Sequence, residues 1–449
     1  MKRKSSLLTY DELCRRVADA GVVGMGGGGF PTHLKFRPRL DAVIVNGAEC
    51  EPLLDCDYFT LKRHGEAVIR GARAVASGCG AADVVLAVKR KNAALAEALA
   101  PLGGFRAVLL DDVYPSGDEL FVIRAALGRT LPQGVIPSFE KIYVGNAATL
   151  KAVDDALAGV PFTRRLVTVC GAVREPGTFD VPLGTRFGDL VAACGGVRVA
   201  GARLVEGGVM MGALASDDDV VRKTTSGVVA LPPDHPAVLE RLRPLAYSAR
   251  VAEHACCQCA RCSELCSRRF LGHDLAPHRL MRLVGARRDY RALHSPTLFN
   301  CSGCGLCSLI ACPFDLSPRR LILEARRVVP RPQGVVPPEP APPPEASCVA
   351  VPTKKVMAKL QLNAWLAPHR FAGEFPLPAA LRVPLQQHAG RPAVAAVQPG
   401  ECVEAGQVIG RPADGGPSAA VHAPAAGTVE SVGDSVTIRT GFGEGRTGG

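Results

Sequence analysis

Eight of the 17 cysteines stand in two short runs with regular spacing. The first run, CCQCARCSELC, contains the pattern C-x2-C-x2-C-x3-C. The second, CSGCGLCSLIACP, contains C-x2-C-x2-C-x4-C and ends in a proline. Three thiolates spaced two residues apart in a tight loop can bind three corners of one small iron–sulfur cube, while the fourth points elsewhere. This spacing predicts one-electron transfer through iron–sulfur clusters.

The fourth cysteine of each run is expected to bind the cluster of the other run, as in two-cluster ferredoxins. The spacing therefore predicts two [4Fe–4S] clusters. The first would be bound by Cys256, Cys259, Cys262 and Cys312, and the second by Cys301, Cys304, Cys307 and Cys266. Ser267 replaces the usual proline after the first run, and the second run carries one extra residue, but neither departure removes a ligand. Cys257 is a spare neighbouring thiol, and only Cys256 gives the even spacing.

Zinc and disulfides are the alternatives for these cysteines. Zinc sites use pairs of ligands and rarely a run of three, and disulfides require an oxidising compartment for which the sequence gives no sign. The nine remaining cysteines are scattered without a framework, which fits a reducing cytosol. His273 and His278 lie between the two runs, but eight cysteines already suffice, so surface or capping roles are favoured for both.

A second group of residues with chemical potential follows a helix predicted at residues 10–20. The stretch GVVGMGGGGFPTHLKF offers bare backbone N–H groups that can curl around a phosphate, and Lys35 supplies a cation. It matches neither the G-x-G-x-x-G fingerprint nor a Walker A loop, so a ligand loop and a flexible turn both remain open. The glycines concerned are Gly24, Gly26, Gly27, Gly28 and Gly29.

A short apolar strand, AVIV at residues 42–45, is followed at once by NGAECEP. Ligands of α/β sheets bind at the carboxyl ends of strands, where Asn46, Glu49 and Glu51 are expected. Carboxylates at a strand end are usually solvated. Beside a glycine loop they more often recognise ribityl, ribose or nicotinamide groups.

These two stretches, GMGGGGFPTHLKF and VNGAECEP, resemble the flavin- and NADH-binding domain of the RnfC subunit of ion-pumping ferredoxin oxidoreductases and of PduS-type cobalamin reductases. A more distant likeness is to the flavoprotein subunit of respiratory complex I. The resemblance implies that the glycine loop holds the phosphate of FMN beside the NADH site. It also implies that FMN or NADH is contacted by the five glycines, Lys35, Asn46, Glu49 and Glu51. Asn146 of IYVGNAATL is a further candidate. This chain departs in having four consecutive glycines, where the family often has Gly-Gly-Ala-Gly, and alanines after Asn146.

The rest of the chain divides by composition and resemblance. The stretch at 166–198 resembles a β-grasp module, and the segment from about 380 resembles a lipoyl-type barrel whose hairpin lacks the modifiable lysine. We therefore expect an α/β multidomain protein. Its predicted parts are a Rossmann-like FMN/NADH-binding domain (1–160), a β-grasp (SLBB) module (161–250), a ferredoxin-like, α-helical two-[4Fe–4S] domain (251–328), a proline-rich linker (329–350) and an RnfC-type barrel-sandwich hybrid domain (351–449).

The net charge of +11 is concentrated around the cysteine runs. No aromatic interleaving or recognised motif accompanies the arginines, so nucleic acid is not the expected partner. A docking face for an acidic electron carrier and a solvated helix face are the two remaining interpretations. The arginines are Arg268, Arg269, Arg279, Arg282, Arg287, Arg288, Arg291, Arg319, Arg320, Arg326 and Arg327.

The N-terminus lacks the apolar run of a signal peptide, and no stretch approaches the ~20 apolar residues of a membrane helix. We expect a cytoplasmic protein and leave open a location in a bacterial microcompartment, a peripheral place at the inner membrane face, and an oligomeric state.

The expected function is that of an oxidoreductase that passes electrons from NADH through FMN and both clusters to a one-electron acceptor. No acid–base or nucleophilic catalytic residue is required, and none is evident. The barrel follows the clusters, which is the PduS-like order and favours cobalamin or a corrinoid protein as acceptor. The alternatives are an RnfC-like subunit of a membrane-associated NADH:ferredoxin complex and a non-catalytic iron–sulfur wire or scaffold protein.

Overall fold

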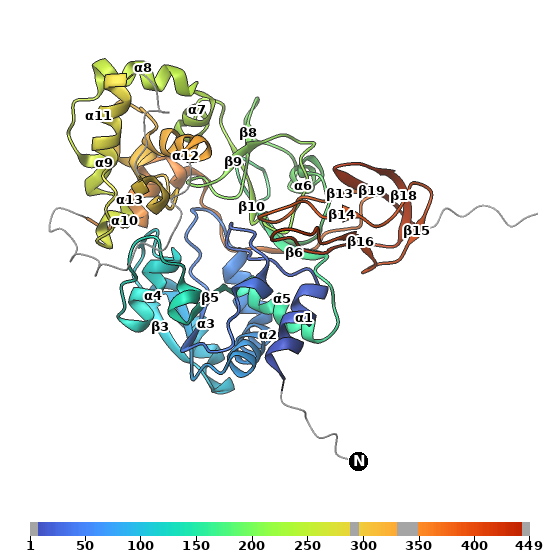
Figure 1. The fold of residues 1–449 in the computed structure, drawn as a ribbon. Coiled ribbons are helices and arrows are strands. Elements are labelled where there is room, and N and C mark those ends of the chain that lie inside the picture. Colours follow the sequence, from blue (N-terminus) through green and yellow to red (C-terminus); the bar gives the residue numbers. More distant parts are fainter. Residues whose placement is uncertain (1–7, 288–295, 330–348, 442–449) are drawn as a thin grey trace, which may run out of the picture.

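A computed structural model describes residues 8–287, 296–329 and 349–441. Figure 1 shows four units: an α/β unit, a mainly β unit, a helical unit and a small β unit near the C-terminus. The predicted α/β multidomain architecture is confirmed. Most of the predicted proline-rich linker at 329–350 lies outside the described residues.

The first unit is built on a parallel sheet with the strand order β3-β2-β1-β5. Its strands are β1 (Ala42–Asn46), β2 (Asp83–Lys89), β3 (Arg106–Leu110) and β5 (Ile142–Asn146). Its helices are α1 (Tyr10–Asp19), α2 (Cys56–Cys79), α3 (Ala93–Leu99), α4 (Glu119–Leu127) and α5 (Ala147–Leu157). The strand order reverses between β1 and β5, so this edge is the topological switch point at which such sheets bind ligands.

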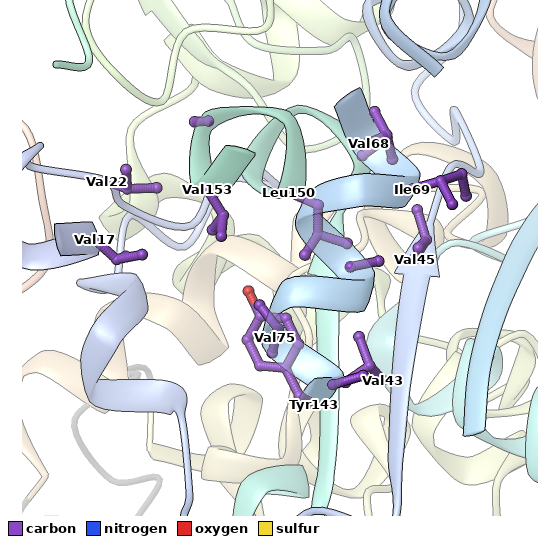
Figure 2. Close-up of a cluster of buried hydrophobic side chains, with 14 of the residues drawn as sticks. Val17, Val22, Val43, Val45, Val68, Ile69, Val75, Tyr143, Leu150 and Val153 are labelled. Atoms are coloured by element: carbon purple, nitrogen blue, oxygen red, sulfur yellow. The ribbon is translucent and has the colours of Figure 1, made fainter. Parts of the chain in front are cut away.

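Side chains alternate across β1, and each face of the sheet has its own core. Val43 and Val45 pack with residues of α1, α2 and α5, as Figure 2 shows, whereas Ile44 packs on the opposite face with residues of α4. All three side chains are fully buried. A strand that is apolar on both faces is typical of a parallel sheet covered by helices on both sides, which fits the run AVIV.

Side-chain caps fix where three of these helices begin. Thr9 accepts a hydrogen bond from the backbone N–H of Glu12 at the start of α1. Asp118 caps α4 through the N–H of Leu120, and Asn146 caps α5 through the N–H of Ala148. Such caps contribute about 1 kcal/mol each. Two of the three therefore fix helices that begin close to the C-terminal edge of the sheet.

The second unit contains a six-stranded mixed sheet with the order β12-β7-β6-β10-β8-β9. The helix α6 (Phe187–Ala193) packs on it, as the predicted β-grasp pattern requires. Its strands are β6 (Arg164–Gly171), β7 (Gly177–Pro182), β8 (Arg203–Glu206), β9 (Ala213–Ala215), β10 (Gly227–Leu231) and β12 (Phe371–Glu374).

Residues 351–374, which we expected to belong to the barrel domain, pair with the first two units. Strand β11 (Val351–Pro352) pairs with β4 (Val113–Tyr114) of the first unit, and β12 pairs with β7 of the second. The helix α13 (Thr353–Lys359) lies between β11 and β12. The chain therefore returns across two earlier units before it enters the barrel.

The third unit holds the cysteine runs between short helices. Its core includes Leu280, Val284, Leu321 and Ile322. The helices are α7 (Pro236–Leu242), α8 (Leu245–Ala255), α9 (Arg261–Glu264), α10 (Ser267–Phe270), α11 (Pro277–Arg287), the π-helix η7 (Leu306–Ala311) and α12 (Pro318–Val328).

The fourth unit packs a sheet of order β13-β19-β18-β15 against one of order β14-β16-β17. Val403, Ile409, Val421 and Val436 lie between them with no exposed surface. This is the predicted barrel-sandwich arrangement. The strands are β13 (Ala380–Pro384), β14 (Val394–Ala395), β15 (Cys402–Val403), β16 (Val408–Arg411), β17 (Val421–His422), β18 (Gly427–Val432) and β19 (Ser435–Thr440).

Candidate functional site

Asn46 and Asn146 lie opposite each other at the carboxyl ends of the neighbouring strands β1 and β5. Asn46 donates through Nδ2 to the carbonyl oxygen of Gly117 at 2.8 Å and accepts from the N–H of Ala48. Asn146 donates through Nδ2 to Oδ1 of Asp57 at 2.8 Å while it caps α5. The two amides therefore hold the loops that leave the switch point of the sheet.

The glycine loop closes on itself beside this edge. The N–H of Gly24 donates to the carbonyl of Phe30 at 2.8 Å, and the N–H of Gly29 donates to the carbonyl of Gly24 at 3.0 Å. A Cβ at Gly26 would lie 3.7 Å from Cβ of Asn146, so the loop borders the end of β5. At Gly27 and Gly28 a Cβ would meet nothing within 4 Å, and both glycines are exposed.

This geometry fits the phosphate loop that the sequence predicts. The tip leaves open space in front of bare backbone, and Gly27 has a φ of +98°, which favours glycine. N–H groups exposed in this way can bind a phosphate without interference from side chains. The open tip of the loop therefore has room for the phosphate end of a flavin nucleotide at the sheet edge.

Glu49 also lies at this edge. Its Oε2 accepts a hydrogen bond from the backbone N–H of Asp57 at 2.8 Å. Burial raises the pKa of Glu49 well above its ordinary value, and the neighbouring Asp57 carboxylate adds to this effect. Burial likewise raises the pKa of Asp57 to about 6. Two partly buried carboxyl groups beside an open loop provide hydrogen-bond acceptors for ribose or amide groups, and one of them can hold a proton near neutral pH.

Lys35 and Glu51 point to other parts of the molecule. Nζ of Lys35 lies 4.0 Å from Oε1 of Glu119 at the start of α4. Glu51 accepts from the N–H groups of Met210 at 2.9 Å and Met211 at 2.8 Å, in the second unit. Its carboxylate therefore fastens the first unit to the second, and its role as a nucleotide contact stays a prediction.

Several residues that support this edge were missed by sequence reasoning. Asp57 stands in the first turn of α2, where acidic residues are common, and that position was its only signal. The hydroxyl of Thr149 accepts from the N–H of Met25 at 2.9 Å, and the N–H of Ala389 in the barrel unit donates to the carbonyl of Gly29 at 2.9 Å. The contacts of Thr149 and Ala389 with the glycine loop are long-range and leave no local pattern in the sequence.

A buried lysine ties three units together behind the glycine loop. Nζ of Lys223, in the second unit, donates to the carbonyl of Gly21 at 2.7 Å and to the carbonyl of Ala420 in the barrel at 2.6 Å. Burial lowers the pKa of this lysine to about 7. The barrel unit thereby helps to fix the position of the loop.

The eight cysteines of the two patterns line two cavities. One cavity is lined by Cys256, Cys259, Cys262 and Cys312, with the neighbouring Cys257 also in its wall, and the other by Cys266, Cys301, Cys304 and Cys307. These are the two crossed sets that the spacing predicts. We call them the outer and the inner cysteine set, because Cys259 is exposed whereas Cys266, Cys304 and Cys307 are buried.

The chemistry of the two sets fits four-iron clusters better than zinc. Among the described residues no three Cys, His, Asp or Glu side chains converge on one metal ion. A four-iron cube binds each thiolate to a different iron and so spaces its ligands more widely. Burial raises the pKa of Cys262 and of Cys266 to about 12, so these thiols ionise only with a cationic partner such as bound iron.

The extra residue in the second run is accommodated by backbone geometry. Between Cys307 and Cys312 the chain forms the π-helix η7, whose i→i+5 bonding accommodates one more residue per turn than an α-helix does. In the first run the shorter spacing from Cys262 to Cys266 spans the α-helical turn α9. The fourth cysteine reaches the other cavity in both runs.

The inner set lies against the first two units. The hydroxyl of Tyr114 donates to the carbonyl of Cys304 at 2.7 Å. A Cβ on Gly305 would lie only 2.9 Å from the carbonyl of Met210, which explains a glycine with a φ of +86° at this position. The inner set therefore contacts both the first and the second unit directly.

The two histidines between the runs bond to the protein, but His273 is buried and not at the surface, and His278 also lines the outer cavity. Nε2 of His273 lies 2.9 Å from the carbonyl of Leu131, and Nδ1 of His278 lies 2.7 Å from the hydroxyl of Ser263.

The predicted arginine face is only partly at the surface. Arg279, Arg282 and Arg287 of α11 are exposed, whereas Arg320 donates to the carbonyl of Arg243 at 2.8 Å and Arg326 to that of Cys301 at 2.9 Å. Arg288 and Arg291 lie outside the described residues. In the described part of the chain, no helix is long and apolar enough to cross a membrane.

Four family models match the chain in order. They are the Nuo51 FMN-binding domain over residues 17–155, the SLBB domain over 166–214, a 4Fe-4S dicluster domain over 255–317 and the RnfC barrel sandwich hybrid domain over 368–441. The order of these matches agrees with the order of the four units.

Two relatives match almost the entire chain. The cobalamin reductase PduS of Salmonella typhimurium is 35% identical over 97% of this chain and 98% of its own length. The cobalamin reductase PduS of Citrobacter freundii is also 35% identical, over 98% of this chain and 99% of its own length. A third relative, one subunit of the proton-translocating ferredoxin:NAD(+) oxidoreductase complex of Clostridium ljungdahlii, is 32% identical over 50% of this chain and 51% of its own.

Proposed function

The chain belongs to the family of the cobalamin reductase PduS, and from that membership we propose that it oxidises NADH and delivers single electrons to cobalamin. It is a redox enzyme of the flavin and iron–sulfur type. Bound FMN would accept the two electrons of a hydride and release them singly, and each of two [4Fe–4S] clusters would carry one electron at a time.

One chain of contacts carries this proposal. Asn46 at the sheet edge donates to the carbonyl of Gly117 at 2.8 Å, and Tyr114, three residues before Gly117, donates to the carbonyl of Cys304 at 2.7 Å. A single short segment therefore touches both the candidate flavin edge and an inner cysteine. Such proximity favours a path in which the inner set receives electrons first and the outer set releases them.

The residues of the first unit would bind and orient the nucleotides. Gly26, Gly27 and Gly28 would hold the FMN phosphate through their backbone N–H groups, while Gly24 and Gly29 close the loop. Asn146 would border this phosphate site, and Asn46 and Glu49 would face the flavin and the NADH beside it. No residue needs to act as an acid, base or nucleophile, because hydride and electron transfer are the chemistry of the cofactors. The protein's contribution is to hold the nucleotides in place at the sheet edge.

The outer set is the candidate exit. Cys259 is exposed, and His278, which lines the outer cavity, precedes the exposed Arg279 and Arg282 on α11. A basic surface beside a redox centre favours an acceptor with negative charge, such as a corrinoid-carrying or other acidic protein. Free cobalamin and such a protein are distinguished by comparing the two as acceptors in the assay below.

The test is anaerobic reconstitution followed by titration with NADH in the presence of cob(III)alamin. We expect bound FMN, bleaching of the iron–sulfur absorption by NADH, and reduction of two molecules of cob(III)alamin for each NADH. A viologen dye serves as a positive control for cluster reduction. Protein that holds clusters but neither retains FMN nor is bleached by NADH would overturn the proposal in favour of an electron wire or scaffold.

A subunit of a membrane-associated ferredoxin complex is the second candidate, favoured by the 32% identity with the Clostridium ljungdahlii protein over half of this chain. That role predicts ferredoxin as the better acceptor and stable co-purification with integral membrane proteins. Faster reduction of cob(III)alamin than of ferredoxin, without membrane partners, would exclude it.

A further inference from the structure

Two arginines that line the inner cavity have buried N–H groups without a hydrogen-bond acceptor in the described structure. They are Arg268 on α10 and Arg319 on α12, and both lie beside inner cysteines in that cavity. Nε and Nη1 of Arg268 and Nε of Arg319 are buried without a hydrogen-bond partner in the described structure. Buried donors without acceptors are costly, so their presence calls for an acceptor that the protein itself does not supply.

Arg268 is held in place by the first unit. Its Nη2 donates to Oδ2 of Asp118 at 3.0 Å, and the two side chains are only 15% and 11% exposed. The stacking of Phe121 on Phe270, with ring centroids 5.6 Å apart, fixes the same junction between α4 and α10. The carboxylate of Asp118 thus fixes one end of the Arg268 guanidinium. The remaining donors, Nε and Nη1, belong to a side chain that lines the inner cavity.

Arg319 is fixed from the second unit. Its Nη2 donates to the carbonyl of Met211 at 2.8 Å, and its own backbone N–H donates to the hydroxyl of Ser308 at 3.0 Å. The residue is 8% exposed, and within the described chain no carboxylate forms an ion pair with it.

The outer cavity has a different lining. Apart from its cysteines it is walled largely by apolar residues, among them Met281, Phe314 and Leu316, and no described lysine or arginine lines it. In place of an arginine, this cavity has the neutral amide of Gln258, whose Nε2 donates to Sγ of Cys256 at 3.1 Å. The two cysteine sets therefore differ in positive charge as well as in exposure.

We propose that Arg268 and Arg319 donate hydrogen bonds to the sulfur atoms of the inner cluster and thereby raise its reduction potential. This inference rests on the proposed function, because it requires a [4Fe–4S] cluster in the inner set. A one-electron reduction takes the cluster core from the 2+ to the 1+ state and adds one negative charge to the cluster and its thiolates. Positive charge and N–H donors at the sulfurs stabilise the more negative state, which raises the potential.

The arrangement assigns each arginine a distinct contribution. The charge of Arg268 is partly offset by Asp118, so that residue acts chiefly through its donors. Arg319 has no such carboxylate partner among the described residues and contributes both charge and a donor. An inner cluster stabilised in its reduced form is the better first acceptor for electrons that leave the sheet edge.

The test is a potentiometric titration of the reconstituted full chain with dithionite, followed by the EPR signals of the reduced clusters. We expect Arg319→Met to shift one of two reduction waves to more negative potential and Arg319→Lys, which keeps the charge, to shift it less. Because Arg268→Met alone would leave Asp118 buried without a partner, it is combined with Asp118→Asn, and this pair should shift the same wave. Arg327→Met is the matched control, since Arg327 lies on the same helix with a side chain 78% exposed.

The shifted wave is assigned in a Cys259→Ser background, which removes an exposed outer ligand and should leave the inner wave. Iron analysis separates the two hypotheses. If the wild-type chain binds less iron than two four-iron clusters require, the proposed function fails. If both clusters form but neither Arg319→Met nor the Arg268–Asp118 double variant moves a wave beyond the Arg327→Met control, this inference is wrong.

Discussion

The phenolic hydroxyl of Tyr114 donates a 2.7 Å hydrogen bond to the carbonyl oxygen of Cys304. Tyr114 belongs to the first unit and Cys304 to the second cysteine run, so this bond joins the nucleotide-type sheet to the inner cysteine set. Burial raises the pKa of Tyr114 well above its ordinary value, and the hydroxyl therefore remains a donor at all physiological pH values.

Replacement of Tyr114 by Phe should slow reduction of the clusters by NADH severalfold. The reason is that the variant loses the bond that holds the inner run against the first unit, and it leaves a buried carbonyl unpaired at a cost of about 1–2 kcal/mol. Stopped-flow bleaching of the clusters by NADH measures the effect, with dithionite reduction as the control. Equal slowing with both reductants would indicate damage to the clusters themselves and not to the path.

A valine at Gly28 should abolish retention of FMN while both clusters remain. At this glycine a Cβ would meet no atom within 4 Å, so the substitution should leave the fold unchanged and fill only the space where a phosphate is expected. Flavin fluorescence after gel filtration and iron content are the readouts. Gly433→Val is the matched control, because a Cβ there also meets nothing within 4 Å. Loss of FMN and iron together in the Gly28 variant would contradict separate sites.

The hydrogen bond from Ala389 to Gly29 predicts that the barrel unit supports nucleotide binding. Ala389→Pro removes the N–H that donates to the carbonyl of Gly29 at 2.9 Å. Loss of about 1 kcal/mol at the loop corresponds to roughly fivefold weaker FMN binding. Fluorescence titration of FMN measures it, and Ala389→Ser, which keeps the N–H, should bind as the wild type does. If the proline variant binds FMN with unchanged affinity, the bond from the barrel unit to Gly29 does not support nucleotide binding.

Lys223 predicts a pH-dependent stability. Its pKa is lowered by burial to about 7, whereas in the unfolded chain it is the ordinary 10.5. Between these values the unfolded state binds more protons, so the free energy of unfolding should rise with pH above 7. His388 and His422, whose pKa values burial also lowers, stay neutral in that range.

The comparison is urea unfolding of the wild type and Lys223→Met from pH 6.5 to 8.5. Thiols of the unfolded chain begin to ionise near the top of this range, but they do so equally in both proteins, so the difference between the two curves isolates Lys223. The wild type should gain stability relative to the variant as the pH rises. Parallel curves would show that the lysine is charged in the folded state throughout the range.

The cysteine sets show how much of the cluster sites the local spacing of cysteines can predict. The spacing of Cys256, Cys259 and Cys262 follows from the reach of a tight loop, and the crossed assignment of Cys266 and Cys312 matches the two cavities of the structure. The extra residue before Cys312 looked like an irregularity in the sequence. Its explanation, a π-helix, depends on how α9 and α12 pack against that turn, which no local pattern encodes.

The strand-end asparagines show the same division. A buried strand followed by Asn46 could be placed from the sequence, and Asn146 was a candidate through the family resemblance. Their direct opposition depends on β5 pairing with β1, a contact 100 residues apart in the chain. Glu51 illustrates the limit, because it looks like a third edge residue yet binds Met210 and Met211 of another unit.

The glycine loop and the cysteine runs came from the sequence alone, because backbone access and thiolate spacing are local requirements that only certain residues meet. What surrounds them was decided by tertiary structure: Lys223 and Ala389 behind the loop, and Arg268 and Arg319 at the inner set. Their roles depend on burial and on partners from distant units. Burial turns an ordinary basic side chain into a strong donor, and it arises only when the units pack together.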